Sequence, residues 1–203
     1  MKTAKIISCL AVFAFLTAGA GRVSAQVSEP NMAELMKAMQ AMTAAASNSA
    51  PVVDFRALKA LLPESLDGFT RTSATGEKNT AMGMTVSQAE GRYEQGDASI
   101  EINLSDNGGM GGLMSFAQAA WASSEIDRET DTGFERTTTY GSHKAREEYD
   151  NEDQRGTIEI LAGGRFMVKA TGYKVAWEAL QSAVKKIDLD ALAALKPAAP
   201  AAP

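Results

Sequence analysis

Residues 98–105 carry the clearest hydrophobic pattern in the chain. Every even position is alanine, isoleucine or leucine, and every odd position is polar. A period of two is typical of a β-strand that buries one face and leaves the other in water. A glycine-rich stretch follows at 106–112, and apolar residues then recur at helical spacing over 113–121. The pattern predicts a strand, a glycine loop and an amphipathic helix.

Similar patterns predict further strands and helices on both sides of this unit. Asp54 can cap a short helix, Trp177 begins the apolar stripe of a closing helix, and Asp188 can cap one more. Gln95-Gly96-Asp97 and Gly163-Gly164 are turn sequences typical of hairpins. We expect the remaining strands at 69–78, 83–93, 125–131, 134–140, 142–149, 157–161 and 165–171.

The order of these elements predicts an α+β fold. Ser99-Ile100-Glu101-Ile102 is echoed by Thr157-Ile158-Glu159-Ile160, and each echo leads on to a helix with a tryptophan. Two such halves would form one antiparallel sheet of about seven strands with helices packed on one face. The element order is similar to that of the Mog1/PsbP-like sheets, and this order alone carries the resemblance.

The first 25 residues have the pattern of a secretory signal peptide. Lys2 and Lys5 precede the apolar run 6–18, and Val23-Ser24-Ala25 suits signal peptidase. The run is shorter than the roughly 20 residues that a spanning helix needs. We expect a mature chain that begins at Gln26 and is periplasmic or secreted, without stable membrane insertion.

Loss of residues 1–25 would change the charge and the redox chemistry of the chain. Three of the 20 basic residues and none of the 25 acidic residues would leave, so the formal net charge would fall from −5 to −8. Such a balance argues against nucleic acid as a partner. Cys9 is the single cysteine, so the mature chain would have no thiol, disulfide or thiolate metal site.

Residues 26–50 form a leader rich in methionine and alanine. Met32, Leu35, Met36, Met39 and Met42 fall on one face of a predicted helix, which a linker joins to the domain at 51–195. Thioethers suit Cu(I), so Met36, Met39 and Met42 are candidate metal ligands. The alternative is an apolar face that packs on the domain or on a partner. At the other end, 196–203 is a Pro/Ala-rich tail predicted to be disordered.

The sequence lacks most of the residue sets that catalysis requires. His143 is the single histidine, and we expect it on the surface, with no Gly-x-Ser-x-Gly elbow for a nucleophilic serine. The acidic residues near 147–153 lack the glycine of an EF-hand loop. No cofactor is predicted.

The glycine loop is the place where we expect a ligand. Gly108, Gly109, Gly111 and Gly112 can offer backbone N–H groups, although the loop matches neither dinucleotide fingerprint. Two hypotheses follow. The first is an exported, soluble, non-catalytic module that binds a protein or a small apolar ligand. The second is a hydrolase that uses carboxylates such as Asp106 or Glu101 beside the loop.

Overall fold

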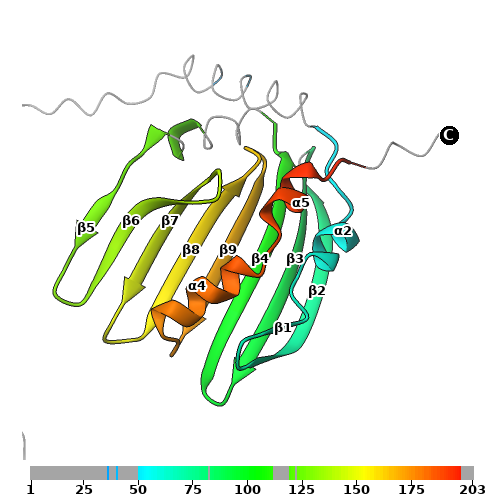
Figure 1. Ribbon diagram of the computed structural model, residues 1–203. Helices are drawn as coiled ribbons and strands as arrows, with labels where there is room; N and C mark the ends of the chain where they lie inside the picture. The colour runs from blue at the N-terminus through cyan, green and yellow to red at the C-terminus, as the bar shows by residue number, and fades with distance from the viewer. Residues whose placement is uncertain are drawn as a thin grey trace, which may run out of the picture.

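The computed structural model describes residues 36, 40, 50–81, 83–111, 119–121 and 123–197. Within these ranges the chain forms one antiparallel sheet of nine strands, in the spatial order β1-β2-β3-β4-β9-β8-β7-β6-β5 (Figure 1). The strands are β1 Ser65–Leu66, β2 Phe69–Ala81, β3 Met84–Gln95, β4 Ala98–Gly109, β5 Asp127–Glu129, β6 Gly133–Tyr140, β7 His143–Asp150, β8 Arg155–Ala162 and β9 Phe166–Tyr173.

The sheet consists of two meanders that meet at its centre. Strands β1 to β4 follow one another along the chain, and so do β5 to β9. The last strand of each meander pairs with the other, so that Ile102 of β4 lies opposite Ala170 of β9. The echo found in the sequence does not follow this symmetry, because it matches β4 with β8, whereas β4 and β9 hold equivalent places at the ends of their meanders.

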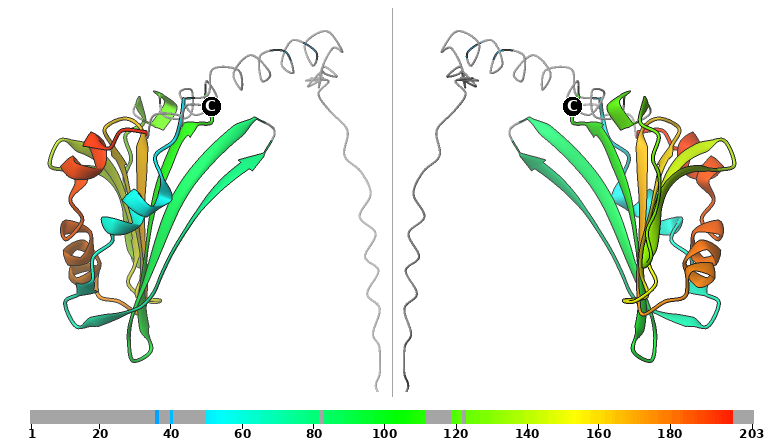
Figure 2. Two further views of the ribbon diagram at one scale, coloured as in Figure 1. Left: turned by 90° about the vertical axis from the view of Figure 1, so that its right-hand side faces the viewer. Right: turned by 90° about the vertical axis from the view of Figure 1, so that its left-hand side faces the viewer.

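Three short helices lie over one face of the sheet, as the side views show (Figure 2). They are α2 Phe55–Ala60, α4 Trp177–Lys185 and α5 Leu189–Ala194. Helix α2 contacts β2, β3 and β4, whereas α4 and α5 contact β8, and α4 also contacts β9. The alternating residues of β4, β8 and β9 that face these helices are fully buried, with Ile100, Leu104, Ile160 and Val168 among them. The core therefore occupies this side of the sheet.

The predicted fold class is wrong. The described chain is dominated by a single nine-stranded antiparallel sheet, and its three helices are only 6, 9 and 6 residues long. It is therefore mostly a β-sheet structure that a few short helices partly cover, and not the balanced α+β fold of about seven strands that we predicted. The Mog1/PsbP-like comparison falls with that prediction. The sheet is larger than predicted because β4 continues through the first glycines to Gly109, and because β1 forms across the Asp67-Gly68 turn.

Several local predictions are confirmed. Gln95 pairs with Ala98 across a turn in which Gly96 has a φ of 58°. Gly163 and Gly164 both have positive φ between β8 and β9. The side chains of Asp54 and Asp188 cap α2 and α5, by accepting from the backbone N–H groups of Arg56 and Ala191 at 2.8 Å.

Much of the leader, the tail and the predicted helix at 113–121 lies outside the described residues. Met36 and Gln40 are helical, and Met36 is 60% exposed. Residues 119–121 and 123 are also helical. Among the described residues, no helix has both the length and the apolar character needed to cross a bilayer.

Candidate functional site

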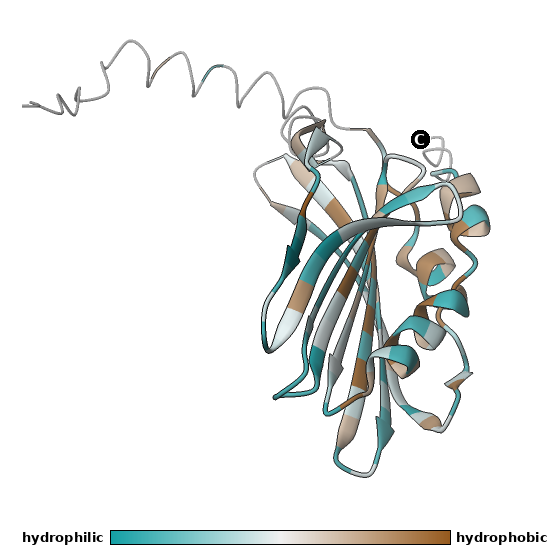
Figure 3. Ribbon diagram, turned by 60° about the vertical axis from the view of Figure 1, so that its left-hand side comes forward, coloured by the Kyte–Doolittle hydropathy of each residue, from teal (hydrophilic) through white to brown (hydrophobic). Residues whose placement is uncertain are grey.

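The two faces of the sheet have opposite character. The face under the helices is filled by the apolar core, and the hydropathy colouring shows polar residues alternating with apolar ones along the central strands (Figure 3). Because alternate side chains of a strand point to opposite faces, the polar residues of β4, β8 and β9 lie on the side away from the helices. We call this side the open face.

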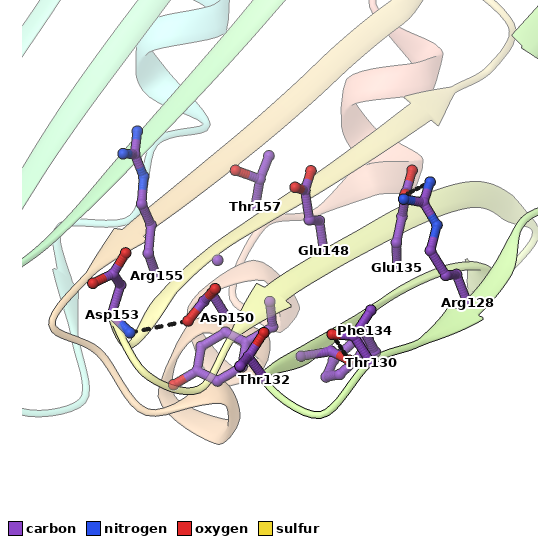
Figure 4. Close-up of a pocket in the computed structure, with 13 residues that line it drawn as sticks. Arg128, Thr130, Thr132, Phe134, Glu135, Glu148, Asp150, Asp153, Arg155 and Thr157 are labelled. Carbon is purple, nitrogen blue, oxygen red and sulfur yellow. Dashed lines mark hydrogen bonds and ion pairs between the residues drawn. The ribbon is translucent and has the colours of Figure 1, made fainter. Parts of the chain in front are cut away.

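A groove of about 480 Å³ lies on the open face, along β5 to β8 (Figure 4). Cross-strand pairing places Glu148 of β7 opposite Thr157 of β8, and Asp150 opposite Arg155. Threonines and charged side chains make up most of its lining. The lining residues are Arg128, Thr130, Thr132, Gly133, Phe134, Glu135, Glu148, Tyr149, Asp150, Asp153, Arg155, Gly156 and Thr157.

One carboxylate of the groove is already neutralised. Glu135 is nearly buried, and its two oxygens are ion-paired with Arg128, at 2.5 Å, and with Arg146. A carboxylate held between two guanidinium groups is a structural tie between β5, β6 and β7. It leaves little acceptor capacity for a ligand.

Three other charged groups of the groove remain available. The side chains of Arg155, Glu148 and Asp153 are exposed, and none of them forms an ion pair or hydrogen bond with another described residue. Asp150 is different, because its Oδ1 accepts from the backbone N–H groups of Glu152 and Asp153 at 2.8 and 3.0 Å. The groove thus presents one cation, on β8, and two carboxylates, on β7 and in the β7–β8 turn, with Thr157 beside them.

An exposed aromatic ring adjoins the groove. Tyr173 of β9 lies opposite Arg155 in the sheet, and it is 51% exposed. Exposed tyrosines offer a rigid apolar surface and a hydroxyl, which suits them to contacts with a partner. A second, smaller hollow of about 130 Å³ continues the polar surface toward Lys169 and shares Glu148 and Thr157 with the groove.

The predicted glycine loop adjoins a buried ion pair. Asp106 is fully buried, and its carboxylate receives two hydrogen bonds from Arg165, at 2.8 and 2.7 Å. It also accepts from the backbone N–H groups of Val53, at 2.8 Å, and Gly108, at 2.9 Å. Arg165 in turn donates to the carbonyl of Pro51 at 2.6 Å. These contacts hold the start of the domain against β4 and the turn before β9. Each oxygen of the Asp106 carboxylate accepts two hydrogen bonds, so none of its capacity is left for a ligand.

The four predicted loop glycines fall into different settings. Gly108 and Gly109 are the last residues of β4, and Gly111 lies in the turn that follows, with a φ of 59°. A Cβ at Gly109 would lie 2.1 Å from the carbonyl oxygen of Thr85, so close strand packing requires glycine there. At Gly108 it would lie 3.0 Å from the Arg165 guanidinium. Gly112 is outside the described residues.

The carboxylates of the hydrolase hypothesis do not converge. Asp106 points to the helix side and Glu101 to the open face, because they occupy even and odd positions of one strand. Neither lines the groove. Of the candidate copper ligands, Met36 is an exposed helical residue, while Met39 and Met42 are outside the described residues. Among the described residues no group of histidine, cysteine and acidic side chains is arranged to hold a metal ion.

A second buried carboxylate lies beneath α4. Glu147 is 2% exposed and accepts from Arg136 Nε at 2.7 Å, from the Tyr140 hydroxyl at 2.7 Å and from Gln181 at 3.4 Å. Burial, followed by the hydrogen bond to Glu147, raises the pKa of the Tyr140 phenol well above its ordinary value of 10.0. The phenol therefore stays protonated and donates its hydrogen bond to the Glu147 carboxylate.

His143 lies in the interior, so its expected surface position is wrong. Its side chain is only 10% exposed because it lies beneath α5. Nδ1 accepts from the backbone N–H of Gly163 at 3.5 Å, and Nε2 lies 3.3 Å from Asp190. These contacts tie the β8–β9 turn to α5.

Sequence reasoning missed the residues that line or adjoin the groove. Glu148, Arg155 and Tyr173 belong to three different strands, and nothing in their local sequence sets them apart from other charged strand residues. The alternation of these residues with buried neighbours was a signal that could have assigned them to the open face of the sheet. The pairing of β7, β8 and β9 alone brings them together.

The groove offers hydrogen-bonding and charged side chains. Its lining contains no serine, cysteine, histidine or lysine. Comparison of the chain with family models, curated proteins and solved structures finds no match.

Proposed function

We propose that this protein is a non-catalytic binding module, and that the groove on its open face takes a charged, polar segment of a protein partner. The observation that carries the proposal is the set of exposed charges of opposite sign, Arg155 against Glu148 and Asp153, which have no partner among the described residues and lie beside Tyr173. Residues on rigid strands are positioned more precisely than residues on loops, which favours recognition.

The chemistry of the lining favours a polar partner over a small apolar ligand. Pockets for small apolar ligands are lined mainly by hydrophobic and aromatic side chains. This groove is lined mainly by threonine, arginine and carboxylates (Figure 4), and it is only partly enclosed. Charged side chains of a peptide could satisfy Arg155 and Glu148 at once, and an arginine can hold a carboxylate with two parallel hydrogen bonds.

A peptide-binding measurement tests the proposal. The purified protein would be screened against an array of mixed-charge peptides, with neutral peptides of the same length as a control. We expect that Arg155→Ala and Tyr173→Ala each weaken binding of the selected peptides by roughly tenfold, the effect of about 1.4 kcal/mol. Arg92→Ala is the matched control, because Arg92 is paired with Glu94 on the other meander. If Arg155→Ala bound the selected peptides with the same affinity as the parent protein, the groove would not be the binding site.

We also propose that the module works outside the cytoplasm, as a periplasmic or secreted protein. The support is the pattern of residues 1–25, with its basic start, apolar run and Val23-Ser24-Ala25. Expression of the full chain in a bacterium with a Sec system, followed by mass spectrometry of the exported fraction, should give a mature N-terminus at Gln26. An uncleaved cytoplasmic product would contradict export.

A further inference from the structure

The two edges of the sheet differ in how well they are protected (Figure 1). The edge at β5 is three residues long, and the segment from Glu125 to Asp131 carries five charged side chains. Short length and charge are the usual devices that prevent a sheet edge from pairing with another chain. This edge is blocked.

The edge at β2 is long and carries fewer charges for its length. β2 is 13 residues long, and β1 pairs only with Phe69 and Thr70. Among the described strands none pairs with the outer side of β2 from Arg71 to Ala81. A bulge at Thr72 interrupts its inner pairing with β3, but the seven residues Ser73–Asn79 beyond it are regular. They contain no proline and two charges, Glu77 and Lys78, of opposite sign.

We propose that this edge pairs with the same edge of a second copy of the chain, antiparallel about a two-fold axis at Gly76. The free segment Arg71–Ala81 is centred on Gly76, so pairing about that residue uses its whole length. An axis of this kind makes the contact isologous and closed, as in most homodimers. The two nine-stranded sheets would then form one continuous sheet.

The charges of β2 are compatible with this register. Glu77 falls opposite Thr75 of the second copy, and Lys78 opposite Ala74, so no like charges face each other directly. Asn79 falls opposite Ser73, a polar pair of the kind that stabilises neighbouring strands. Glu77 is also engaged by Asn79, whose side chain donates to it at 2.9 Å, which diminishes diagonal repulsion between the two Glu77 side chains.

Gly76 adds an apolar contact at the axis. A Cβ at this position would lie 2.6 Å from Cδ2 of Phe55, so glycine is what allows the Phe55 ring to lie against the edge strand. Phe55 is half-buried, with the Arg56 guanidinium 4.5 Å from the centre of its ring. The two-fold axis brings the two Phe55 rings close together on the helix side, where their contact would exclude water.

The register can be tested by placing a charge opposite Glu77. In Thr75→Glu, the new carboxylate of each copy would lie opposite Glu77 of the other copy. The two-fold axis therefore creates two such repulsive pairs. We expect the dimer dissociation constant, measured by sedimentation equilibrium of the full chain, to rise roughly tenfold or more. Thr75→Lys is the matched variant of similar size, and it should keep or strengthen the dimer. Both variants would be checked for a native circular dichroism spectrum.

A double variant removes the remaining ambiguity. Thr75 also faces Glu90 of β3 within one chain, so Thr75→Glu introduces repulsion there as well. Thr75→Glu with Glu77→Lys leaves Glu90 unchanged but restores opposite charges between copies, so it should recover the dimer. The proposal would be overturned if the parent chain were monomeric, or if Thr75→Glu left the dimer dissociation constant unchanged. It would also be overturned if Thr75→Glu and Thr75→Lys weakened the dimer equally. So would capture of a foreign strand by a monomer at this edge.

Discussion

Asp106 and Glu147 are both buried carboxylates on the helix side of the sheet, but they are satisfied in different ways. Asp106 receives two of its hydrogen bonds from backbone N–H groups, of Val53 and Gly108, and the other two from Arg165. Glu147 receives hydrogen bonds only from the side chains of Arg136, Tyr140 and Gln181. Asp106 thus holds backbone segments in place, whereas Glu147 links side chains of β6, β7 and α4.

The arginine partners sharpen the contrast. The Arg165 side chain is 25% exposed, whereas that of Arg136 is 45% exposed. A half-exposed guanidinium can be solvated by water when its partner is lost, but backbone N–H groups held in the interior cannot. Loss of the Asp106 charge should therefore cost more stability than loss of the Glu147 charge. Two measurements test this expectation directly, and two more examine the buried phenols, in order of expected effect.

The largest effect is expected for Asp106→Asn. The amide keeps one acceptor oxygen but places N–H donors against groups that are themselves donors, and it leaves Arg165 without its counter-charge. We expect a loss of about 3–5 kcal/mol in the free energy of unfolding, measured with denaturant. Asp97→Asn is the control, because the Asp97 side chain is 91% exposed and should contribute less than about 0.5 kcal/mol.

Glu147→Gln should destabilise the protein less, by about 1–2 kcal/mol. The glutamine keeps an acceptor for the Tyr140 hydroxyl, and water can reach the half-exposed Arg136. Glu94→Gln serves as the control, since Glu94 is an exposed carboxylate 3.1 Å from Arg92. A loss equal to that of Asp106→Asn would break the distinction between the two carboxylates.

Tyr140→Phe should cost about 1 kcal/mol, as typical for the loss of one hydrogen bond. Because the Tyr140 hydroxyl donates to Glu147, its removal in the Glu147→Gln background should cost less than in the parent. A double-mutant cycle in denaturant measures this coupling. Additive losses would show that the hydroxyl acts independently of the carboxylate.

Raising the pH should give the smallest and most gradual loss in the free energy of unfolding. Burial raises the pKa of the Tyr93, Tyr140 and Tyr149 phenols above 10.0, so the folded state holds these protons where the unfolded chain releases them. Stability should be fully present below pH 10 and fall as the pH rises above it. Denaturant titrations at increasing pH would measure the slope, which Tyr140→Phe should reduce. A slope that stays unchanged would exclude Tyr140 as a contributor.

The local elements could be predicted because their signals are short-range. Alternation identified the Ala98–Ser105 strand, Gly96 and the Gly163-Gly164 pair identified two hairpin turns, and Asp188 identified a helix start. Each depends on the preferences of a few neighbouring residues. Element sizes were less certain, because β4 gains its last residues from pairing with β3 at Gly109 and not from their own propensity, since glycine is unfavourable in strands.

The candidate site could not be predicted in the same way. The glycine stretch drew attention because its composition is unusual, but part of it continues β4 beside the Asp106–Arg165 pair. Those two residues are 59 positions apart, and no local pattern relates them. Glu148, Arg155 and Tyr173 are ordinary strand residues until the pairing of β7, β8 and β9 makes them neighbours.

The sequence by itself therefore determined which residues form strands, where the chain turns, and which side of each central strand is apolar. These properties follow from backbone geometry and hydrophobicity over a few residues. Only the tertiary structure decided that the two meanders join through β4 and β9, and that His143 is covered by α5. It also decided that one sheet edge is short and charged, while no described strand pairs with most of the other. Those outcomes depend on contacts between distant segments, for which one sequence carries no local signal.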